Sequence, residues 1–301
     1  MNDGDMAGGE LGEYLKALRA RTRPEDVGLP PAGVNRRVPG LRREELAQLA
    51  GVSVDYYTRL EQGRHQHPSH SVIEAVATAL RLDDAERAHL INLAGDGVRD
   101  RPRPGSRAQR VRPELLDLMD GLTGHPAFVI GRRTDVLAAN ALARALIADW
   151  HAMPARERNY VRWLLLAPEA RSLYPDWPTV AAEAVGTLRL DAGRYPDDPA
   201  TRQLVGELAM TSEDFRRWWS DHRVVERSHG TKRMRHPVVG ELEIHYEAMN
   251  LPGDPDQTLF LYTTRAGSPS RDAMRLLSSW LATAAEPARP EIHSAEVDAD
   301  R

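Results

Sequence analysis

The first third of the chain carries its apolar residues at helical spacing. Leu11, Leu15 and Leu18 recur at intervals of three and four residues, so they share one face of a helix. Similar short apolar faces follow as far as about residue 95. The pattern therefore predicts an all-α domain of five short helices over residues 10–96.

Two pairs of polar residues are expected to open helices in this domain. Ser71 with Glu74, and Asp83 with Glu86, have the spacing of a capping box. In such a box each side chain accepts a hydrogen bond from the backbone N–H of the other residue, which fixes the start of the helix. We therefore expect helices to begin beside Ser71 and Asp83.

A polar segment follows the helical domain. Residues 97–112 have no apolar face and contain Pro102, Pro104 and several arginines, which is typical of a linker. The arginines either stay solvated or contact DNA phosphates, and the sequence does not decide between these two hypotheses.

Beyond the linker, strand-like runs alternate with helical ones. Residues 127–131 and 135–139 form a predicted hairpin, and 241–249 and 257–264 predict two more strands. We therefore predict a multi-domain chain in which the all-α domain precedes an α+β domain. That second domain is expected to span residues 113–284, with a disordered tail over 285–301. Helices are expected at about 141–148, 157–166, 177–192, 200–210, 213–220 and from Ser270 to Leu281.

Composition excludes several classes of protein. No apolar run reaches the roughly 18 residues of a membrane span, and the start of the chain does not resemble a secretory signal. The absence of cysteine excludes disulfides and thiolate zinc sites, and it fits the cytoplasm, where we expect the protein. The net charge is −4, yet residues 16–64 hold ten basic and six acidic side chains. This local positive excess suits a polyanionic partner such as DNA.

The segment EELAQLAGVSVDYYTRLEQGR (44–64) predicts a helix-turn-helix motif. Gly51 suits the tight turn between the helices, where a residue without Cβ adopts positive φ. Val52 is expected to fill the corner, Ser53 to cap the second helix, and Gly63 to end it in the left-handed conformation. Because each position has its own physical reason, the joint pattern is specific.

The second helix of the motif is expected to enter the major groove. Tyr57 and Leu60 face the core, so the remaining side chains face the DNA. The guanidinium of Arg59 matches guanine O6 and N7, whereas Asp55 either contacts a cytosine amino group or interacts with the helix N-terminus. The expected base contacts are Val54, Asp55, Tyr56, Thr58 and Arg59, and the expected phosphate contacts are Arg36, Arg37, Arg42, Arg43 and Arg64.

A single motif reads too few base pairs for a genome-scale search. We therefore expect a homodimer on a pseudo-palindromic double-stranded operator, with half-sites about 34 Å apart.

The motif resembles the Xre family, which are phage-repressor-like helix-turn-helix proteins. The longer pattern RPEDVGLP (23–30) and PGLRREELAQLAGVSVDYYTRLEQGR (39–64) is similar to a narrower group, the MmyB-like regulators. This resemblance implies a lambda-repressor-like domain followed by a PAS-like ligand-binding domain. It also implies a transcription regulator, expected to be a repressor, that needs no cofactor and senses a small lipophilic ligand such as a fatty acid. The second half of the chain also resembles the MmyB-like regulators, in the segments RRTDVLAAN (132–140), LRLDAGRYPDDP (188–199), SEDFRRWWSDH (212–222), HPVVGELEIHYEAM (236–249) and LFLYTTRAGSPS (259–270).

A ligand pocket is expected in the second domain, where the aromatic residues concentrate. We expect ligand binding to shift the population between two arrangements of the DNA-reading helices. For each apolar candidate, ordinary core packing is the alternative, and for Asn140 the alternative is a helix N-cap. The candidate lining residues are Phe128, Ile130, Leu137, Asn140, Trp163, Trp177, Leu188, Phe215, Trp219 and Tyr262.

Two other classes of function are alternatives to a ligand-responsive regulator. A metal site at His65, His67 and His70, or an enzyme active site, is disfavoured because no metalloprotease, nucleophile-elbow or P-loop motif accompanies these residues. We therefore expect neither a metal nor catalysis. A DNA-bound dimeric scaffold without a small-molecule ligand stays open as the alternative.

Overall fold

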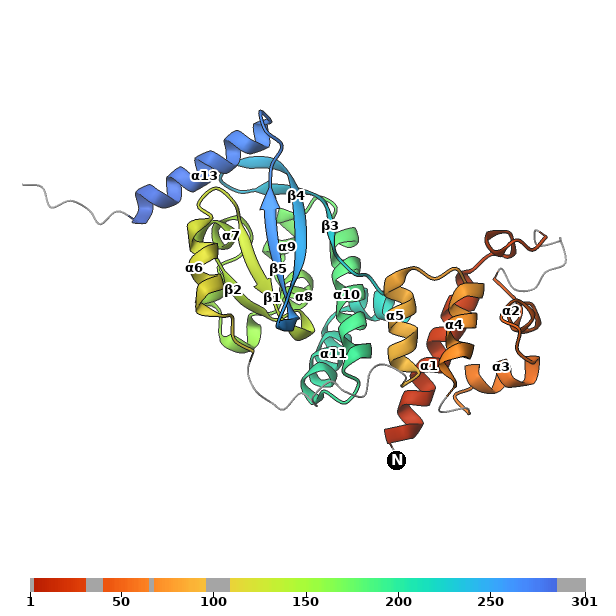
Figure 1. Cartoon of the computed structure of the whole chain (residues 1–301). Coiled ribbons are helices and arrows are strands. Elements are labelled where there is room, and N and C mark those ends of the chain that lie inside the picture. Colours follow the sequence, from red (N-terminus) through yellow and green to blue (C-terminus); the bar gives the residue numbers. More distant parts are fainter. Residues whose placement is uncertain (1–2, 31–39, 65–67, 96–108, 286–301) are drawn as a thin grey trace, which may run out of the picture.

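The computed structural model describes residues 3–30, 40–64, 68–95 and 109–285. Its N-terminal part is all-helical, as predicted (Figure 1). Tyr57 and Leu60 are fully buried at the centre, and Val52 packs against the same core. The elements are α1 (Asp3–Arg21), the 3₁₀ helix η1 (Pro24–Val27), α2 (Arg43–Leu49), α3 (Val54–Glu61), α4 (His70–Ala79) and α5 (Asp84–Leu93).

One of the two predicted capping boxes is confirmed. Asp83 Oδ1 accepts from the Glu86 N–H at 2.8 Å, and Glu86 Oε2 accepts from the Asp83 N–H at 3.4 Å. The box at Ser71 is wrong, because α4 begins at His70 with Ser69 in the N-cap position. The Ser71 hydroxyl pairs with that of Ser69 instead, and Glu74 turns toward Arg87 of α5.

The C-terminal part is built on a five-stranded antiparallel sheet in the order β2-β1-β5-β4-β3. The predicted hairpin corresponds to β1 (Ala127–Ile130) and β2 (Val136–Ala139), and the two later strands to β4 (Gly240–Leu251) and β5 (Asp254–Thr263). The edge strand β3 (His229–His236) was not predicted. The α+β class is thus confirmed.

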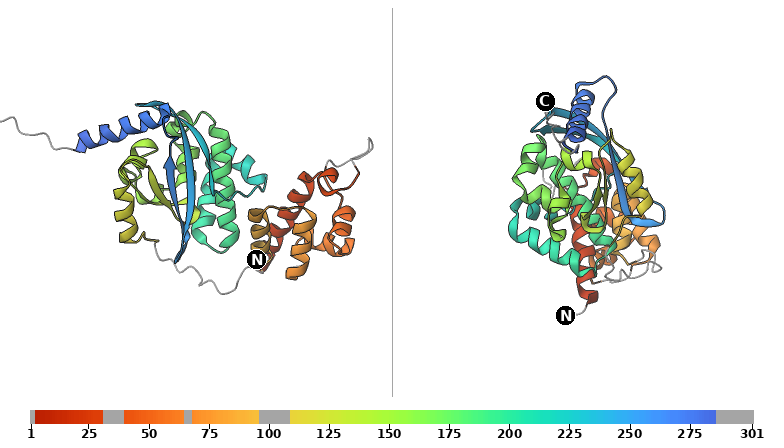
Figure 2. Two further views of the ribbon diagram at one scale, coloured as in Figure 1. Left: turned by 45° about the horizontal axis from the view of Figure 1, so that its top comes forward. Right: turned by 90° about the vertical axis from the view of Figure 1, so that its left-hand side faces the viewer.

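The two faces of this sheet are covered differently (Figure 2). One face packs Phe128, Tyr246 and Phe260 against the large helical layer, whereas Val129 and Leu259 on the other face meet α6. Within the described part of the chain, every helix is too short or too polar to cross a bilayer. The helices are α6 (Pro113–Gly121), α7 (Ala141–Leu146), α8 (Tyr160–Leu166), α9 (Pro168–Leu173), α10 (Trp177–Arg194), α11 (Pro199–Thr211), α12 (Glu213–Ser220) and α13 (Pro269–Ala285), of which α6 and α9 were not predicted.

Candidate functional site

Helix α3 is positioned by the local features that the sequence indicated. Gly51 has φ +67° in the turn, and Gly63 has φ +69° after the helix, where a side chain would be strained. Ser53 occupies the N-cap, and its Oγ accepts from the Tyr56 N–H at 3.1 Å. The helix-turn-helix geometry is therefore formed as predicted.

The outer face of α3 carries the expected base-reading side chains. Val54 is 45% exposed, and the side chains of Asp55 and Arg59 are also exposed. Arg59 Nη2 lies 2.7 Å from Asp55 Oδ2 one helical turn away, an ion pair that was not predicted. Such an exposed pair contributes about 0.3–0.5 kcal/mol, so DNA can compete for Arg59. Tyr56 and Thr58 are half-buried on the flanks.

A buried carboxylate fixes α3 against its neighbours. Glu61 accepts from Arg19 of α1 at 2.7 and 2.9 Å and from Arg43 of α2 at 2.9 Å. Burial alone would raise the pKa of the Glu61 carboxyl, but these arginines outweigh that effect and hold it below its usual value. Gly12 lets α1 approach, because a Cβ there would lie 2.4 Å from the Glu61 carbonyl oxygen. This network was not predictable from local sequence patterns, since Glu61 lies 18 residues from Arg43 and 42 from Arg19.

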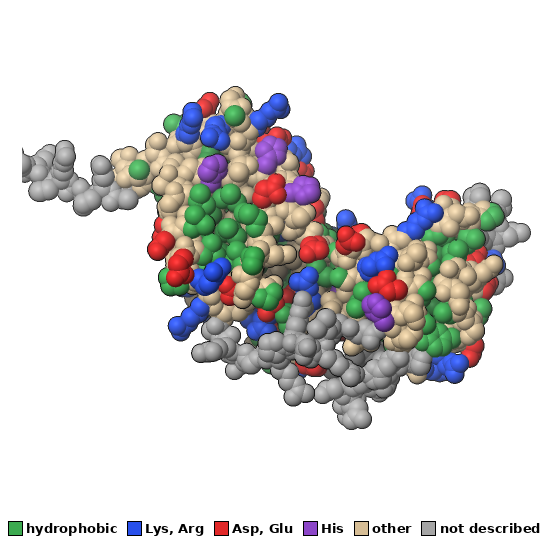
Figure 3. Space-filling view, viewed as in Figure 1, with side chains coloured by type: hydrophobic (Ala, Val, Ile, Leu, Met, Phe, Trp, Pro, Cys, Tyr) green, Lys and Arg blue, Asp and Glu red, His purple; other side chains and the backbone are tan. Residues whose placement is uncertain are grey.

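The candidate phosphate contacts divide into three groups. Arg42 and Arg64 are exposed, whereas Arg43 is partly engaged by Glu61. Arg36 and Arg37 lie outside the described residues, as do His65 and His67. Among the described residues, no group of three or more acidic or histidine side chains could hold a metal ion. On the face that Figure 3 shows, basic and acidic side chains of the N-terminal domain are interspersed.

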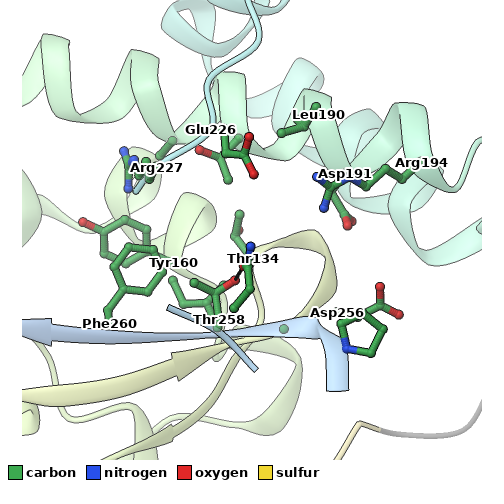
Figure 4. Close-up of a pocket in the computed structure, with 16 residues that line it drawn as sticks. Thr134, Tyr160, Leu190, Asp191, Arg194, Glu226, Arg227, Asp256, Thr258 and Phe260 are labelled. Carbon is green, nitrogen blue, oxygen red and sulfur yellow. Dashed lines mark hydrogen bonds between the residues drawn. The ribbon is translucent and has the colours of Figure 1, made fainter. Parts of the chain in front are cut away.

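A cavity of about 100 Å³ lies in the C-terminal domain between α10 and the sheet. Figure 4 shows Arg227, Tyr160 and Phe260 at one end and Asp191 and Asp256 at the other. Its apolar wall is formed by Ile130, Ala184, Leu190 and Phe260. The cavity is therefore amphipathic, with an aromatic inner end and a polar rim.

Cationic groups surround the inner end. The Arg227 side chain is 5% exposed, and its buried Nε has no hydrogen-bond partner among the described residues. Behind the cavity wall, Lys232 Nζ donates to the hydroxyls of Tyr160 at 3.2 Å and Tyr262 at 3.3 Å. Burial lowers the pKa of Lys232. Burial would raise the pKa of Tyr160, but the charges of Lys232 and Arg227 outweigh it and lower that pKa. Two basic side chains, Arg227 and Lys232, therefore lie at the inner end, and the carboxylate of Glu183 lies 3.8 Å from Arg227 Nη2.

The rim is a hydrogen-bonded polar network. Asp191 Oδ2 accepts from the Arg133 N–H at 2.8 Å, and burial raises the pKa of Asp191 to about 6. The Arg133 guanidinium pairs with Asp135 at 2.7 Å and Asp198 at 2.8 Å. The Tyr195 hydroxyl donates to Asp256. These contacts fix the end of α10 to the loop after β1.

Most of the expected pocket residues are placed elsewhere. Ile130 lines the cavity, whereas Phe215 and Trp219 stack at 5.2 Å beside a groove between the two domains. Asn140 is corrected to the N-cap of α7, because its Oδ1 accepts from the Ala143 N–H at 2.9 Å and its amide donates to three carbonyls. Six others pack in the sheet cores and do not line the cavity: Phe128, Leu137, Trp163, Trp177, Leu188 and Tyr262.

Two known families match this arrangement. A model described as "Helix-turn-helix domain" matches residues 10–90. A model described as "MmyB-like transcription regulator ligand binding domain" matches residues 111–277, which is more than half of the chain. The chain belongs to the MmyB-like transcription regulators. It is a DNA-binding regulator with a ligand-binding domain, and both families are those of a regulator rather than an enzyme. A comparison with curated proteins finds no match.

Proposed function

We propose that this MmyB-like regulator is a repressor that binds a pseudo-palindromic operator as a homodimer and is controlled by a small lipophilic acid, such as a fatty acid, in the cavity beside α10. The observation that carries the ligand class is the buried Arg227 donor beside the apolar side chains of Ile130, Ala184 and Phe260 in an amphipathic cavity.

The DNA-reading part of the proposal rests on α3. Its exposed face presents Val54, Asp55 and Arg59 while Tyr57 and Leu60 anchor it. A bidentate arginine–guanine contact contributes about 1–3 kcal/mol of discrimination between bases. Because the Arg59–Asp55 pair is exposed, it can open at little cost when DNA binds.

Duplex selection from a random library tests this assignment. The wild-type protein is expected to enrich one sequence with two-fold symmetry. Arg59→Ala should then weaken binding to that duplex by about 5- to 150-fold, whereas Arg156→Ala, a matched loss of an 85% exposed arginine in the C-terminal domain, should not. Equal losses in both variants would contradict a base contact by Arg59.

The ligand part rests on charge and polarity. A carboxylate at the inner end would accept from Arg227 and lie against the ring of Tyr160, whose hydroxyl accepts from Lys232 behind the cavity wall. The chain of the acid would lie along Ala184 and Leu190. At about 100 Å³ the cavity is smaller than most ligand sites, which usually measure about 300–1,000 Å³. A medium-chain acid must therefore open the cavity.

The small cavity also favours the second candidate, a dimeric scaffold without ligand. Titration calorimetry with decanoate at pH 7.5 separates the two. The regulator proposal predicts saturable binding that Arg227→Gln weakens by about 10- to 150-fold, because a charge-assisted hydrogen bond contributes about 1.5–3 kcal/mol. The control Arg156→Gln should bind like the wild type. Absence of heat from octanoate, decanoate and tetradecanoate alike would favour the scaffold.

A further inference from the structure

The two domains meet where α5 lies against α10 (Figures 1 and 2). The imidazole of His89 sits directly over Gly193, and a Cβ added to Gly193 would lie 2.3 Å from His89 Nδ1. His89 is 2% exposed, and the ring of Tyr14 meets it edge-on at 4.7 Å. Only glycine therefore leaves room for the imidazole at this point of α10.

Arg189 of α10 lies at the same domain interface. It is 4% exposed, its guanidinium stacks 4.0 Å from the Trp219 ring centre, and it donates to the Trp219 carbonyl. Its Nη1 also lies 3.2 Å from His222 Nδ1. Glu10 and Glu13 of α1 share with Arg189 a groove of about 770 Å³ between the domains. The DNA-binding domain thus faces a positive charge held on α10.

Helix α10 has the ligand cavity on its other face. Leu190 and Arg194 line the cavity, and each directly follows a residue at the domain interface. These interface residues are Arg189, which lines the groove, and Gly193, which lies against His89. Because an α-helix moves as a rigid element over one turn, a displacement at the cavity displaces the interface.

The segment from His222 to Arg227 runs alongside α10 and, like α10, reaches both the cavity and the domain interface. Arg227 lines the cavity at one end, and His222 contacts Arg189 at the other. Between them, Val225 packs onto Gly186, where a Cβ would lie 2.8 Å from the valine side chain, and its carbonyl accepts from Thr187 Oγ1 at 3.1 Å. Two connected elements therefore have one end in the cavity and one at the domain interface.

We propose that the His89–Gly193 contact docks the DNA-binding domain on α10, and that α10 with residues 222–227 transmits opening of the cavity to that docked domain. A group that enlarges the cavity displaces α10 from the sheet, loosens the His89–Gly193 contact and changes the orientation of α3. The trigger rests on the proposed ligand site, whereas the docking contact does not.

Docking is tested without ligand or DNA. Gly193→Ala should raise the radius of gyration in small-angle X-ray scattering and speed hydrogen exchange in α5. Gly206→Ala is the matched control, because a Cβ there meets nothing within 4 Å. The double variant His89→Ala/Gly193→Ala should restore compactness, since removing the imidazole makes room for the new Cβ and lets the remaining α5–α10 contacts close again. Scattering by Gly193→Ala equal to that of the control, or no rescue in the double variant, would overturn the docking contact.

Transmission is tested by filling the cavity with a side chain. Ala184→Leu on α10 and Thr258→Leu on β5 each place a larger side chain into the cavity, from opposite walls. Each of these variants that keeps the wild-type circular dichroism spectrum should speed hydrogen exchange in α5. When such a variant is combined with Gly193→Ala, α5 should exchange no faster than in Gly193→Ala alone. Unchanged α5 exchange in a folded cavity variant would refute transmission. Failure of decanoate to bind, with a positive result here, would instead reject only the proposed ligand class.

Discussion

Glu61→Gln should destabilise the DNA-binding domain more than any surface substitution on α3. The Glu61 side chain is 1% exposed, and that of Arg19, its bidentate partner at 2.7 and 2.9 Å, is 11% exposed. Removing one partner of a buried ion pair costs about 3–5 kcal/mol, because the other charge stays buried. Arg43 is 43% exposed and adds at most about 1 kcal/mol. Since glutamine keeps one acceptor oxygen, we expect a loss of about 3 kcal/mol.

Hydrogen exchange of α3 in the full chain, measured across a urea series, gives this free energy locally. Asp55→Asn is the matched control, the same carboxylate-to-amide change on the same helix in an exposed pair, and should cost less than about 0.5 kcal/mol. Because the folded-state pKa of Glu61 is lowered, its contribution is present above the unfolded value of about 4.3 and is lost as pH falls below it. The difference between wild type and Glu61→Gln should therefore shrink at low pH. If Glu61→Gln and Asp55→Asn lowered the local free energy of unfolding equally at pH 7, the buried ion pair would not be the source of stability.

Three further outcomes are expected. Because burial raises the pKa of Asp191 to about 6, Asp191→Asn should stabilise the chain at pH 7.5 by about 1–2 kcal/mol, with no gain at pH 4, in urea unfolding. Burial and the charge of Arg189 lower the pKa of His89 to about 3 and of His222 to about 4. Docking is thus complete above pH 6.5 and lost as pH falls toward 4, which scattering should show as a rising radius of gyration. Lys232→Met should raise the melting temperature by removing a buried cation, yet weaken decanoate binding in calorimetry; unchanged affinity would exclude Lys232 from the anion site.

Local signals made the DNA-binding motif predictable, and their absence explains what was missed. Gly51 and Ser53 act within one turn of the chain, so their pattern is visible in sequence. Strand β3 escaped prediction because its buried positions include Lys232 and His236, which read as polar. Lys232 is buried with tyrosine partners from distant segments, and His236 with the carbonyl of Ala145.

The cavity was the least predictable feature. Aromatic residues such as Phe128 and Trp163 mark the core because they pack well, whereas the cavity is lined by a mixture of small, charged and apolar residues from separate segments. The domain contact is equally hidden, since His89 and Gly193 come from different domains and neither carries a local motif.

Anisotropy titration of the selected duplex, with and without saturating decanoate, tests the central claim that the C-terminal cavity controls DNA reading by α3. We predict that decanoate weakens binding of the wild-type chain by about 5- to 150-fold, the usual range of coupling between two sites, and has no such effect on Arg227→Gln. If calorimetry showed that decanoate was bound, yet the wild-type chain bound the duplex with the same affinity with and without it, control of DNA binding by the cavity would be contradicted.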